Sequence, residues 1–385
     1  MRRDHNQHLI EELLAIADVR IGGGRSWDLT VHDDDFYPRV AAGGSLALGE
    51  TYVEGVWDCP ALDAFFHRAL RSRLDERVPS GIGPIQSLRS RLQNPQSRAN
   101  AFEVGERHYD LGNDLYRAML DTRMIYSCAV WDRASTLDDA QEDKLELACR
   151  KLGLERGMTL LDLGCGWGGG ACYAAERFGV SVVGVTVSRR QAELAREVCA
   201  GLPVEIRLQD WREVEGRFDR VISIGMFEHV GARNYAAFFE RCLDLLRPDG
   251  LALLHTIGGT RSETTCEPWM ERYIFPNSMV PSARQLTRAL EGSFVIEDWH
   301  NLGADYDRTL TSWYRNFENS WDELRPGYGE RFRRMWKYYL LSSAGSFRAR
   351  RSQVWQLVLS PLGVPGGYRR PRLDTRAANE VLLMA

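Results

Sequence analysis

A glycine-rich turn between a predicted strand and a predicted helix constrains the fold of this chain more than any other feature. The sequence DLGCGWGG covers residues 162–169, and Gly164, Gly166 and Gly169 have the spacing GxGxxG. This spacing is typical of a loop whose backbone approaches a nucleotide cofactor closely. The alternative is a turn that only closes a strand–helix unit. Because the three glycines follow a strand and precede a helix, we favour the cofactor loop.

Short β-rich runs alternate with helical stretches over the larger part of the chain, which predicts an α/β fold with a mostly parallel sheet. Seven strands are expected, and this number sets the size of the sheet. The predicted strands cover residues 158–163, 181–186, 204–208, 219–224, 250–257, 294–298 and 355–360.

The 385 residues leave room for two domains. The spacing of apolar residues predicts a helix over 9–17 and another over 62–74, and the stretch 27–57 reads as a few short strands. We therefore expect a small α+β domain at 1–80. A basic linker would cover 81–98, and the catalytic α/β domain would cover 99–385.

Charge and cysteine content exclude several classes of protein. The 49 basic and 53 acidic residues give a net charge of −4, which argues against a nucleic-acid partner. The eight cysteines form no CxxC pair and no Cys/His cluster, so we expect neither a metal site nor a disulfide, as in a reducing cytoplasm. No apolar stretch is long enough to span a membrane, so any membrane contact would be peripheral.

Two cofactors compete for the glycine loop, a nicotinamide nucleotide and S-adenosylmethionine. A nicotinamide site needs an acid at the tip of the second strand to bind the ribose hydroxyls. Here that strand runs into Val185, Thr186 and Ser188, without an acid. Asp162, two residues before Gly164, would instead hold a positively charged methionine moiety and repel a pyrophosphate. The sequence therefore favours S-adenosylmethionine.

Two further features of the sequence each allow two interpretations. Asp210 and Trp211, after the third strand, could bind an adenine amino group and stack on the base, or could be a helix cap and a core tryptophan. The segment Arg331–Arg351 carries six arginines and Lys337 without an acid. It could contact lipid headgroups, or it could be the solvated face of a helix.

Several motifs occur together in one order along the chain. They are HYDLGN at 108–113, YSCA at 126–129, GMFEHVG at 225–231, LHTIG at 254–258 and GADYD at 303–307, with LGETY at 48–52, WDC at 57–59 and FRAR at 347–350 outside them. With these motifs the chain resembles cyclopropane-fatty-acyl-phospholipid synthases over nearly its whole length. The resemblance implies a class I methyltransferase (Rossmann-like) sheet of seven strands, S-adenosylmethionine as the methylene donor and a membrane phospholipid with a cis double bond as substrate. It also implies a homodimer at the inner face of the membrane, with the N-terminal domain in dimerisation and lipid contact.

The resemblance assigns the site residues position by position. The cofactor residues would be Tyr126, Ser127, Asp162, Gly164, Gly166, Gly168, Thr186, Gln191, Asp210 and Trp211. The bicarbonate site of the family would fall on Cys128, Glu228, His255, Ile257 and Tyr306.

The chemistry of such a reaction makes its own demands. An isolated alkene attacks only a strongly activated methyl group, and the resulting carbocation must lose a proton to close a ring, so the site needs a base and aromatic walls. Glu228 and His255 follow or end strands at the edge where such groups belong, although one could be a helix cap and the other a core histidine. His108 and His229 rank lower as bases.

Some positions depart from the family pattern. Ser343 replaces a cysteine, which rules out a covalent cysteine mechanism there, and Val130, Thr311 and Ser312 also differ. Two other functions are kept as alternatives. One is a lipid methyltransferase that gives a branched or hydroxylated chain, and the other is a lipid-binding scaffold without catalysis.

Overall fold

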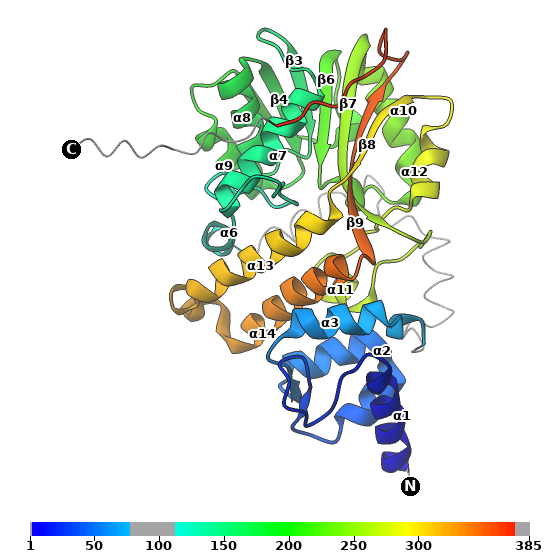
Figure 1. Ribbon diagram of the computed structural model, residues 1–385. Helices are drawn as coiled ribbons and strands as arrows, with labels where there is room; N and C mark the ends of the chain where they lie inside the picture. Colours follow the sequence, from blue (N-terminus) through cyan, green and yellow to red (C-terminus); the bar gives the residue numbers. More distant parts are fainter. Residues whose placement is uncertain (1, 78–111, 374–385) are drawn as a thin grey trace, which may run out of the picture.

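The computed structural model describes residues 2–77 and 112–373. Its centre is a seven-stranded sheet with the order β5-β4-β3-β6-β7-β9-β8 (Figure 1). Neighbouring strands are parallel except for β9, which is antiparallel to both β7 and β8. The strands are β3 Thr159–Leu163, β4 Ser181–Thr186, β5 Val204–Leu208, β6 Phe218–Ile224, β7 Leu246–Gly259, β8 Val295–Asn301 and β9 Ser352–Ser360. All seven predicted strands are confirmed, and the fold is the predicted α/β class.

Helices cover both faces of the sheet because successive strand side chains point to opposite sides. In β3, Leu160 packs in a core with α7 and α8, whereas Leu161 and Leu163 pack in a core with α10 and α12. The helices of this part are α7 Leu137–Lys151, α8 Gly169–Phe178, α9 Arg189–Val198, α10 Tyr235–Leu245 and α12 Ala283–Leu290, with the 3₁₀ turns η3 Trp211–Glu213, η4 Phe227–His229 and η5 Ala232–Asn234.

Side-chain caps fix where several of these helices begin. Thr136 accepts a hydrogen bond from the Asp139 amide at the start of α7, and Ser188 accepts one from the Gln191 amide at the start of α9. Such caps satisfy amide groups that would otherwise lack partners in the first turn. The ends of β4 and β5 are thereby held next to the glycine loop.

The N-terminal unit is mostly helical, which corrects the expectation of several strands over 27–57. Most of that stretch is one helix, and the strands are a pair of two residues each. Its elements are α1 Arg2–Ile16, β1 Thr30–Val31, α2 Phe36–Val53, β2 Trp57–Asp58, α3 Leu62–Arg71 and η1 Leu74–Glu76.

The glycines that suggested strand boundaries have other roles in α2. Gly44 has a φ of 56° and marks a kink inside the helix. Gly49 lies against the Trp269 ring, where a Cβ would come within 2.3 Å of the ring carbon Cδ1. The glycine therefore permits close helix packing, which the sequence alone does not distinguish from a break.

A helical layer lies between the N-terminal unit and the sheet (Figure 1). Its elements are α6 Asn113–Met119, α11 Pro268–Tyr273, α13 Gly303–Asn319 and α14 Trp321–Arg348. Trp57 and Phe65 from the N-terminal unit share one buried cluster with Trp313 and Trp336 from the layer. The proposed domain of residues 1–80 is therefore packed on the catalytic part through a continuous apolar core.

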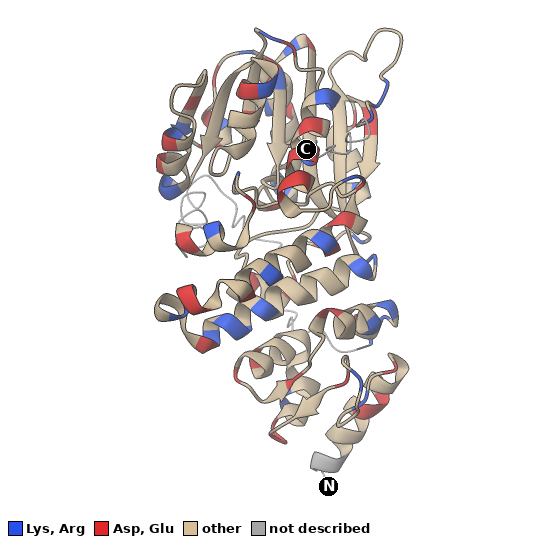
Figure 2. Ribbon diagram, turned by 60° about the vertical axis from the view of Figure 1, so that its left-hand side comes forward, with Lys and Arg blue, Asp and Glu red and all other residues tan. Residues whose placement is uncertain are grey.

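Four cations of the basic segment Arg331–Arg351 pair with acids elsewhere in the fold. Arg334 pairs with Asp58 at 2.9 Å, and the other three pairs are Arg333 with Glu318, Arg348 with Asp63 and Asp307, and Arg351 with Asp75 and Glu76. These ion pairs join α14 and the residues after it to α13 and the N-terminal unit. Blue and red segments of the ribbon in Figure 2 mark charged residues in these parts of the chain. These four side chains therefore have a structural role, and contact of the segment with lipid headgroups stays a prediction.

The structure contains a disulfide that the sequence analysis did not expect. Cys172 in α8 and Cys199 after α9 are bonded, with their Cα atoms 5.6 Å apart. The two cysteines lie 27 positions apart in the sequence, and the packing of consecutive helices brings them together. Cysteine spacing alone carried no sign of this contact.

Membrane-spanning helices and metal sites were searched for in the described part of the chain. Among residues 2–77 and 112–373, no helix combines the length and apolarity that a membrane crossing requires. The same residues contain no cluster of three or more His, Cys, Asp or Glu side chains suited to a metal ion. The predicted basic linker 81–98 and His108 lie outside the described residues.

Candidate active site

A cavity of about 170 Å³ opens where β3, β4, β5 and β6 end, at the edge of the sheet that carries the glycine loop. Nine of the ten predicted cofactor residues line it, and Gly168 does not. The nine are Tyr126, Ser127, Asp162, Gly164, Gly166, Thr186, Gln191, Asp210 and Trp211. The structure thus brings together residues that span 86 positions of the sequence, from 126 to 211.

The glycine loop forms one wall of the cavity in a backbone conformation that disfavours other residues. Gly164 and Gly166 have φ angles of 99° and 55°. A Cβ on Gly164 would come within 2.6 Å of Met226, whereas a Cβ on Gly166 would enter open space. The loop therefore leaves room for a ligand at Gly166, which fits a nucleotide-type cofactor.

Asp162 and Asp210 are the two buried acids that line this cavity, and Asp162 lies next to the glycine loop. Asp162 is 7% exposed, and burial raises its pKa to about 7, an effect that the nearby Lys144 ammonium opposes. A carboxylate in such a place gains most when a cation pairs with it. The methionine part of S-adenosylmethionine carries such a cation, so Asp162 fits the role that the sequence predicted.

The polar residues that follow β4 and β5 interact with each other and also line the cavity. Thr186 donates a hydrogen bond of 2.8 Å to the Gln191 side chain. Asp210 caps η3 and pairs with Arg212 at 2.9 Å, while Trp211 packs against Phe238 in the core. Asp210 and Trp211 are therefore a cap and a core residue that also line the cavity, and their contact with adenine stays a prediction.

Helix α7 fixes the loop that carries Tyr126 and Ser127. The Gln141 amide donates to the Ser127 carbonyl at 2.9 Å, and the Lys144 ammonium donates to Ser127 Oγ at 2.8 Å. Asp121 accepts hydrogen bonds from the amides of Arg123 and Ile125 at the start of the same loop. The sequence analysis missed Gln141 and Lys144. Both residues lie at helical spacing on the face of α7 that carries buried apolar residues, and this pattern could have indicated that they are buried.

Glu228 and Ile257 meet directly, as the predicted bicarbonate site requires. Glu228 Oε1 accepts a hydrogen bond of 2.7 Å from the Ile257 amide. The other carboxyl oxygen, Oε2, is buried without a hydrogen-bond partner among the described residues. Burial raises the pKa of Glu228 to about 7. A partly protonated carboxyl with a vacant position can donate to an anion.

His255 is joined to the cavity through the backbone. Its carbonyl accepts from the amide of Gly225, a cavity residue, at 2.9 Å. The Gln356 side-chain amide lies 3.2 Å from His255 Nδ1 and holds the ring in place. Burial lowers the pKa of His255 well below its usual value, so the ring is neutral.

Cys128 and Tyr306 lie on a second set of elements. The Cys128 thiol points to backbone carbonyls, those of Ala129 at 3.3 Å and Leu302 at 3.7 Å. Tyr306 belongs to an aromatic group whose rings lie 4.6 to 5.8 Å apart. The group includes Tyr126, Tyr306, Trp313 and Phe347. Tyr126 also lines the cavity, so aromatic faces extend from the cofactor pocket into the core.

His229, ranked as a second choice of base, lines the cavity directly. Its position follows from η4, the short turn after β6. Burial lowers its pKa to about 4, so the ring is neutral at physiological pH. His229 was ranked lower because it does not end a strand, but the structure places it in the lining of the cofactor cavity.

A family model described as Mycolic acid cyclopropane synthetase matches residues 96–357 of the chain. The cyclopropane-fatty-acyl-phospholipid synthase of Escherichia coli strain K12 is 48% identical over 370 residues, which cover 96% of this chain and 97% of that protein. The chain belongs to the cyclopropane synthase family.

Two other relatives bear on the cofactor and on the reaction. A crystal structure of the mycolic acid cyclopropane synthase CmaA1 complexed with SAH and CTAB superposes with a TM-score of 0.63, at 33% identity, and covers 67% of this chain and 97% of that one. The tuberculostearic acid methyltransferase UfaA1 of Mycobacterium tuberculosis is 32% identical and covers 89% of this chain and 85% of that protein. The chain is an S-adenosylmethionine-dependent enzyme of the methyltransferase fold.

Proposed function

We propose that this enzyme transfers a methylene group from S-adenosylmethionine to the cis double bond of an unsaturated phospholipid acyl chain. One carbon–sulfur bond of the cofactor breaks, two carbon–carbon bonds to the former alkene carbons form, and one proton leaves the transferred methyl group. The product is a cyclopropane ring together with S-adenosylhomocysteine. When bound, the cofactor supplies the electrophilic methyl group.

The observation that carries this proposal is the position of Glu228 and His255 behind the wall of the cofactor cavity. Gly225 lines the cavity and donates its amide to the His255 carbonyl, and Glu228 follows three residues later. The buried Oε2 of Glu228 without a partner among the described residues marks a vacant polar position in this wall. A small anion could be held there.

In this proposal the anion is bicarbonate. Glu228, His255 and Tyr306 would hold it with their side chains, and Cys128 and Ile257 with backbone groups. Bicarbonate would supply a base for the methyl proton, which is strongly acidic on a carbocation, so position matters more than base strength. The rings of Tyr306 and Trp313 lie 5.8 Å apart and would stabilise a cation by their π faces.

A branched or hydroxylated product is the second candidate, and the relationship to UfaA1 gives it specific support. The products differ in mass. A ring adds CH₂ (about 14 Da), a saturated methyl branch adds CH₄ (about 16 Da), and methylation with hydration adds about 32 Da. Purified enzyme, S-adenosylmethionine and unsaturated phospholipid vesicles should give the first gain with loss of the double bond. A gain of about 16 or 32 Da would favour the second candidate, and no product would leave the scaffold alternative.

The anion cage has its own test. Glu228→Ala and His255→Ala should each lower turnover by at least about tenfold while the affinity for S-adenosylmethionine stays nearly unchanged. Wild-type activity should fall in bicarbonate-depleted buffer and recover when bicarbonate is returned. Full activity of Glu228→Ala without bicarbonate would show that the base lies elsewhere, with His229 the next residue to test.

Contact with the inner face of the membrane and assembly into a homodimer belong to the proposal as well. Three of the departures from the family pattern, Val130, Thr311 and Ser312, concern the fit of the acyl chain, and Ser343 concerns the covalent mechanism. Val130 is fully buried and donates its amide to the Ala140 carbonyl, whereas Thr311 and Ser312 line a pocket between α13 and the segment 131–137. Ser343 is half-buried on α14.

A further inference from the structure

Lys144 is a fully buried ammonium group in the wall of the cofactor cavity. It donates one hydrogen bond, to Ser127 Oγ at 2.8 Å, and no carboxylate of the described residues lies within ion-pair distance of it. Two of its three N–H groups therefore have no acceptor in the part of the chain that the structure describes. Burying a charge in this state is costly unless an anion completes its surroundings.

The hydrogen bond between Lys144 and Ser127 also orients the serine. Because an ammonium group can only donate, Ser127 Oγ is the acceptor, and its own hydrogen is directed elsewhere. No acceptor for that hydrogen is present among the described residues, and Ser127 lines the cavity. Lys144 and Ser127 together thus present N–H and O–H donors to the same space.

Charges of both signs lie along this wall. Lys144 and Asp162 both line the cavity, and the Lys144 ammonium opposes the rise in the pKa of Asp162. Burial in turn lowers the pKa of Lys144 to about 8, and the carboxyl groups of Asp121 and Asp162 oppose this effect. A ligand that carries one anionic and one cationic group matches such a wall. The methionine part of S-adenosylmethionine, with its α-carboxylate and α-ammonium groups, is a ligand of this kind.

We infer that Lys144 and Ser127 bind the α-carboxylate of the cofactor, opposite the cationic groups that Asp162 holds. This inference rests on the proposed cofactor residues and adds Lys144 to them. Bicarbonate is a second carboxylate-type anion near this site, but Glu228, His255 and Ile257 are not among the residues that line the cavity. Lys144 and Ser127 both line it, so the cofactor carboxylate is the ligand that the geometry favours.

The test compares two ligands that differ in the methionine part. S-adenosylhomocysteine has the carboxylate, whereas 5′-methylthioadenosine lacks the amino-acid group. In Lys144→Met, calorimetry should show an affinity for S-adenosylhomocysteine that is about 10- to 100-fold lower, with little change for methylthioadenosine. An equal change for both ligands, or no change, would overturn the inference. Decarboxylated S-adenosylmethionine, which keeps the ammonium group, should behave like methylthioadenosine.

Lys151 provides a matched control. It lies two turns further along α7 and is equally buried, but its ammonium pairs with Asp298 at 3.1 Å and contacts His300 Nδ1 at 3.1 Å. Lys151→Met should lower stability and leave the ratio of the two ligand affinities at the wild-type value. A similar shift of the ratio in Lys151→Met would mean that distortion of α7, and not a carboxylate contact, explains the Lys144 result.

Two further arms keep the test decisive. Ser127→Ala removes the second donor without removing a buried charge, so it should shift the same ratio even if Lys144→Met folds poorly. If the effect of Lys144→Met appears only when bicarbonate is present, bicarbonate is the anion and the inference is wrong. If the wild-type enzyme binds neither S-adenosylmethionine nor S-adenosylhomocysteine, the proposed cofactor site itself fails, and that outcome is distinct from a failure of Lys144 alone.

Discussion

At the scale of single residues, burial couples cofactor binding to pH. Asp162 has a pKa raised to about 7, so its carboxyl group is largely protonated below that pH and must ionise before it can pair with a cation. We expect the affinity for S-adenosylhomocysteine to rise by about fivefold from pH 6 to pH 7 and then to level off towards pH 8, because Lys144, with a pKa lowered by burial to about 8, begins to lose its charge there. Calorimetry across this range measures it.

The control for this prediction is Asp162→Asn, which keeps the shape of the side chain but cannot ionise. It should bind more weakly and lose the rise of affinity that belongs to Asp162. A wild-type affinity that is independent of pH, or a variant with an unchanged pH profile, would show that Asp162 does not hold the cationic end of the cofactor.

The role of a residue could be predicted where it belongs to a sequence motif. It could not be predicted where it depends on how helices pack together. The glycine loop and Asp162 follow from their place after β3, because parallel strands put their carboxyl ends at one edge. Lys144 belongs to no motif, and its role depends on the loop that α7 holds. The pairing of Cys172 with Cys199 likewise depends on how α8 packs beside α9.

At the scale of elements, α14 owes its position to ion pairs as well as to apolar contacts. Arg348 binds Asp307 of α13 at 2.8 Å and Asp63 of α3 at 2.7 Å, so one guanidinium joins three helices. Arg348→Met leaves two partly buried carboxylates close together without a cation. We expect the free energy of unfolding in urea to fall by about 1–3 kcal/mol.

Arg350, two residues further on, is the matched control. It is exposed, and its hydrogen bond to Asn301 is 3.4 Å long. Arg350→Met should change the free energy of unfolding by no more than about 0.5 kcal/mol. Equal losses in the two variants would contradict a specific role for the Arg348 pairs.

Elements of the sheet were easier to predict than those of the N-terminal unit. All seven strands were recognised, and the central ones, such as β3, are largely buried on both faces and read as nearly continuous apolar runs. In α2, glycines and aromatic residues resembled strand and turn signals. Gly49 is in fact required by the Trp269 ring, which comes from a helix more than 200 residues away in the sequence. A contact of that kind cannot be seen in a local pattern.

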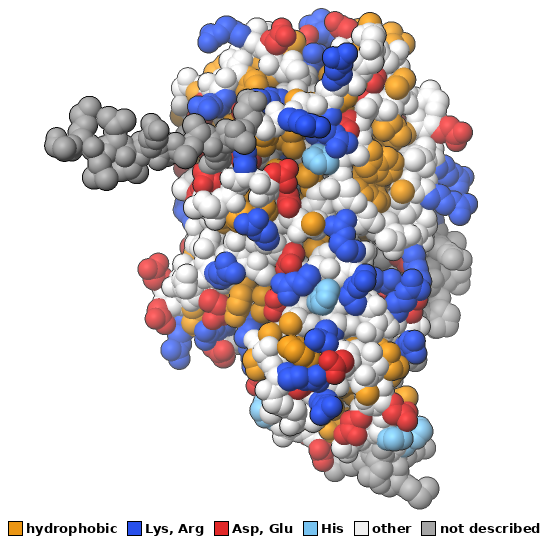
Figure 3. Space-filling view, viewed as in Figure 1, with side chains coloured by type: hydrophobic (Ala, Val, Ile, Leu, Met, Phe, Trp, Pro, Cys, Tyr) orange, Lys and Arg blue, Asp and Glu red, His pale blue; other side chains and the backbone are white. Residues whose placement is uncertain are grey.

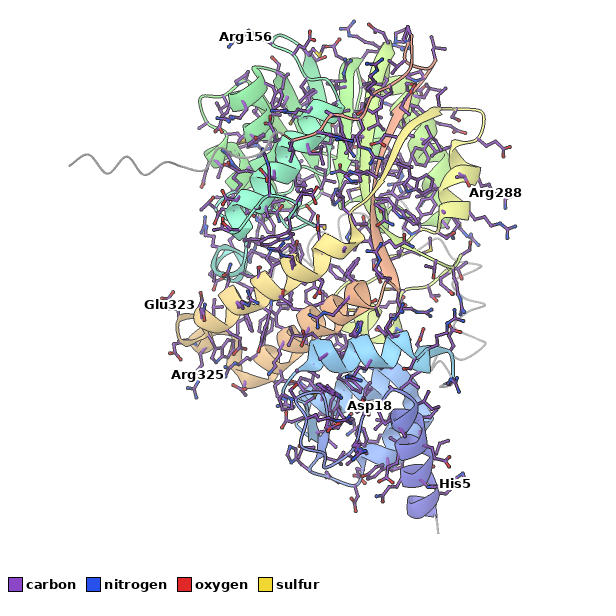
Figure 4. All side chains as sticks on the ribbon, in the orientation of Figure 1. His5, Asp18, Arg156, Arg288, Glu323 and Arg325 are labelled. Carbon is purple, nitrogen blue, oxygen red and sulfur yellow. A yellow bond between two sulfur atoms is a disulfide. The ribbon has the colours of Figure 1, made fainter. Side chains whose placement is uncertain are left out.

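At the scale of the whole molecule, charge is spread over the surface. Cationic and anionic side chains are interspersed on the face shown in Figure 3. Among the described residues, Arg325 and Arg331 of α14 are exposed cations without an ion pair, and Arg325 lies beside Glu323 at the outer end of the α13–α14 hairpin (Figure 4). We therefore choose these two exposed cations of α14 to test binding to a membrane.

We expect reversible binding to anionic vesicles that weakens as salt increases. Replacing both Arg325 and Arg331 by Gln should weaken binding about tenfold or more at low salt, since each cation near an anionic surface contributes about 1 kcal/mol. Arg156 and Arg288, at the sheet end of the molecule (Figure 4), offer a control with the same change of charge. Binding is measured by flotation with vesicles. If both double variants bind equally weakly, net charge and not the position of the cations on the hairpin determines binding.

The central claim is that a ring forms from the transferred methyl group with loss of one of its hydrogens. The most direct measurement uses S-adenosylmethionine with a trideuterated methyl group, unsaturated phospholipid vesicles and mass spectrometry of the acyl chains. We predict that the product retains two deuterium atoms and no longer contains a double bond, because a CD₂ unit bridges the former alkene carbons. A saturated product that retains all three deuterium atoms, or one that keeps a double bond, would contradict the account.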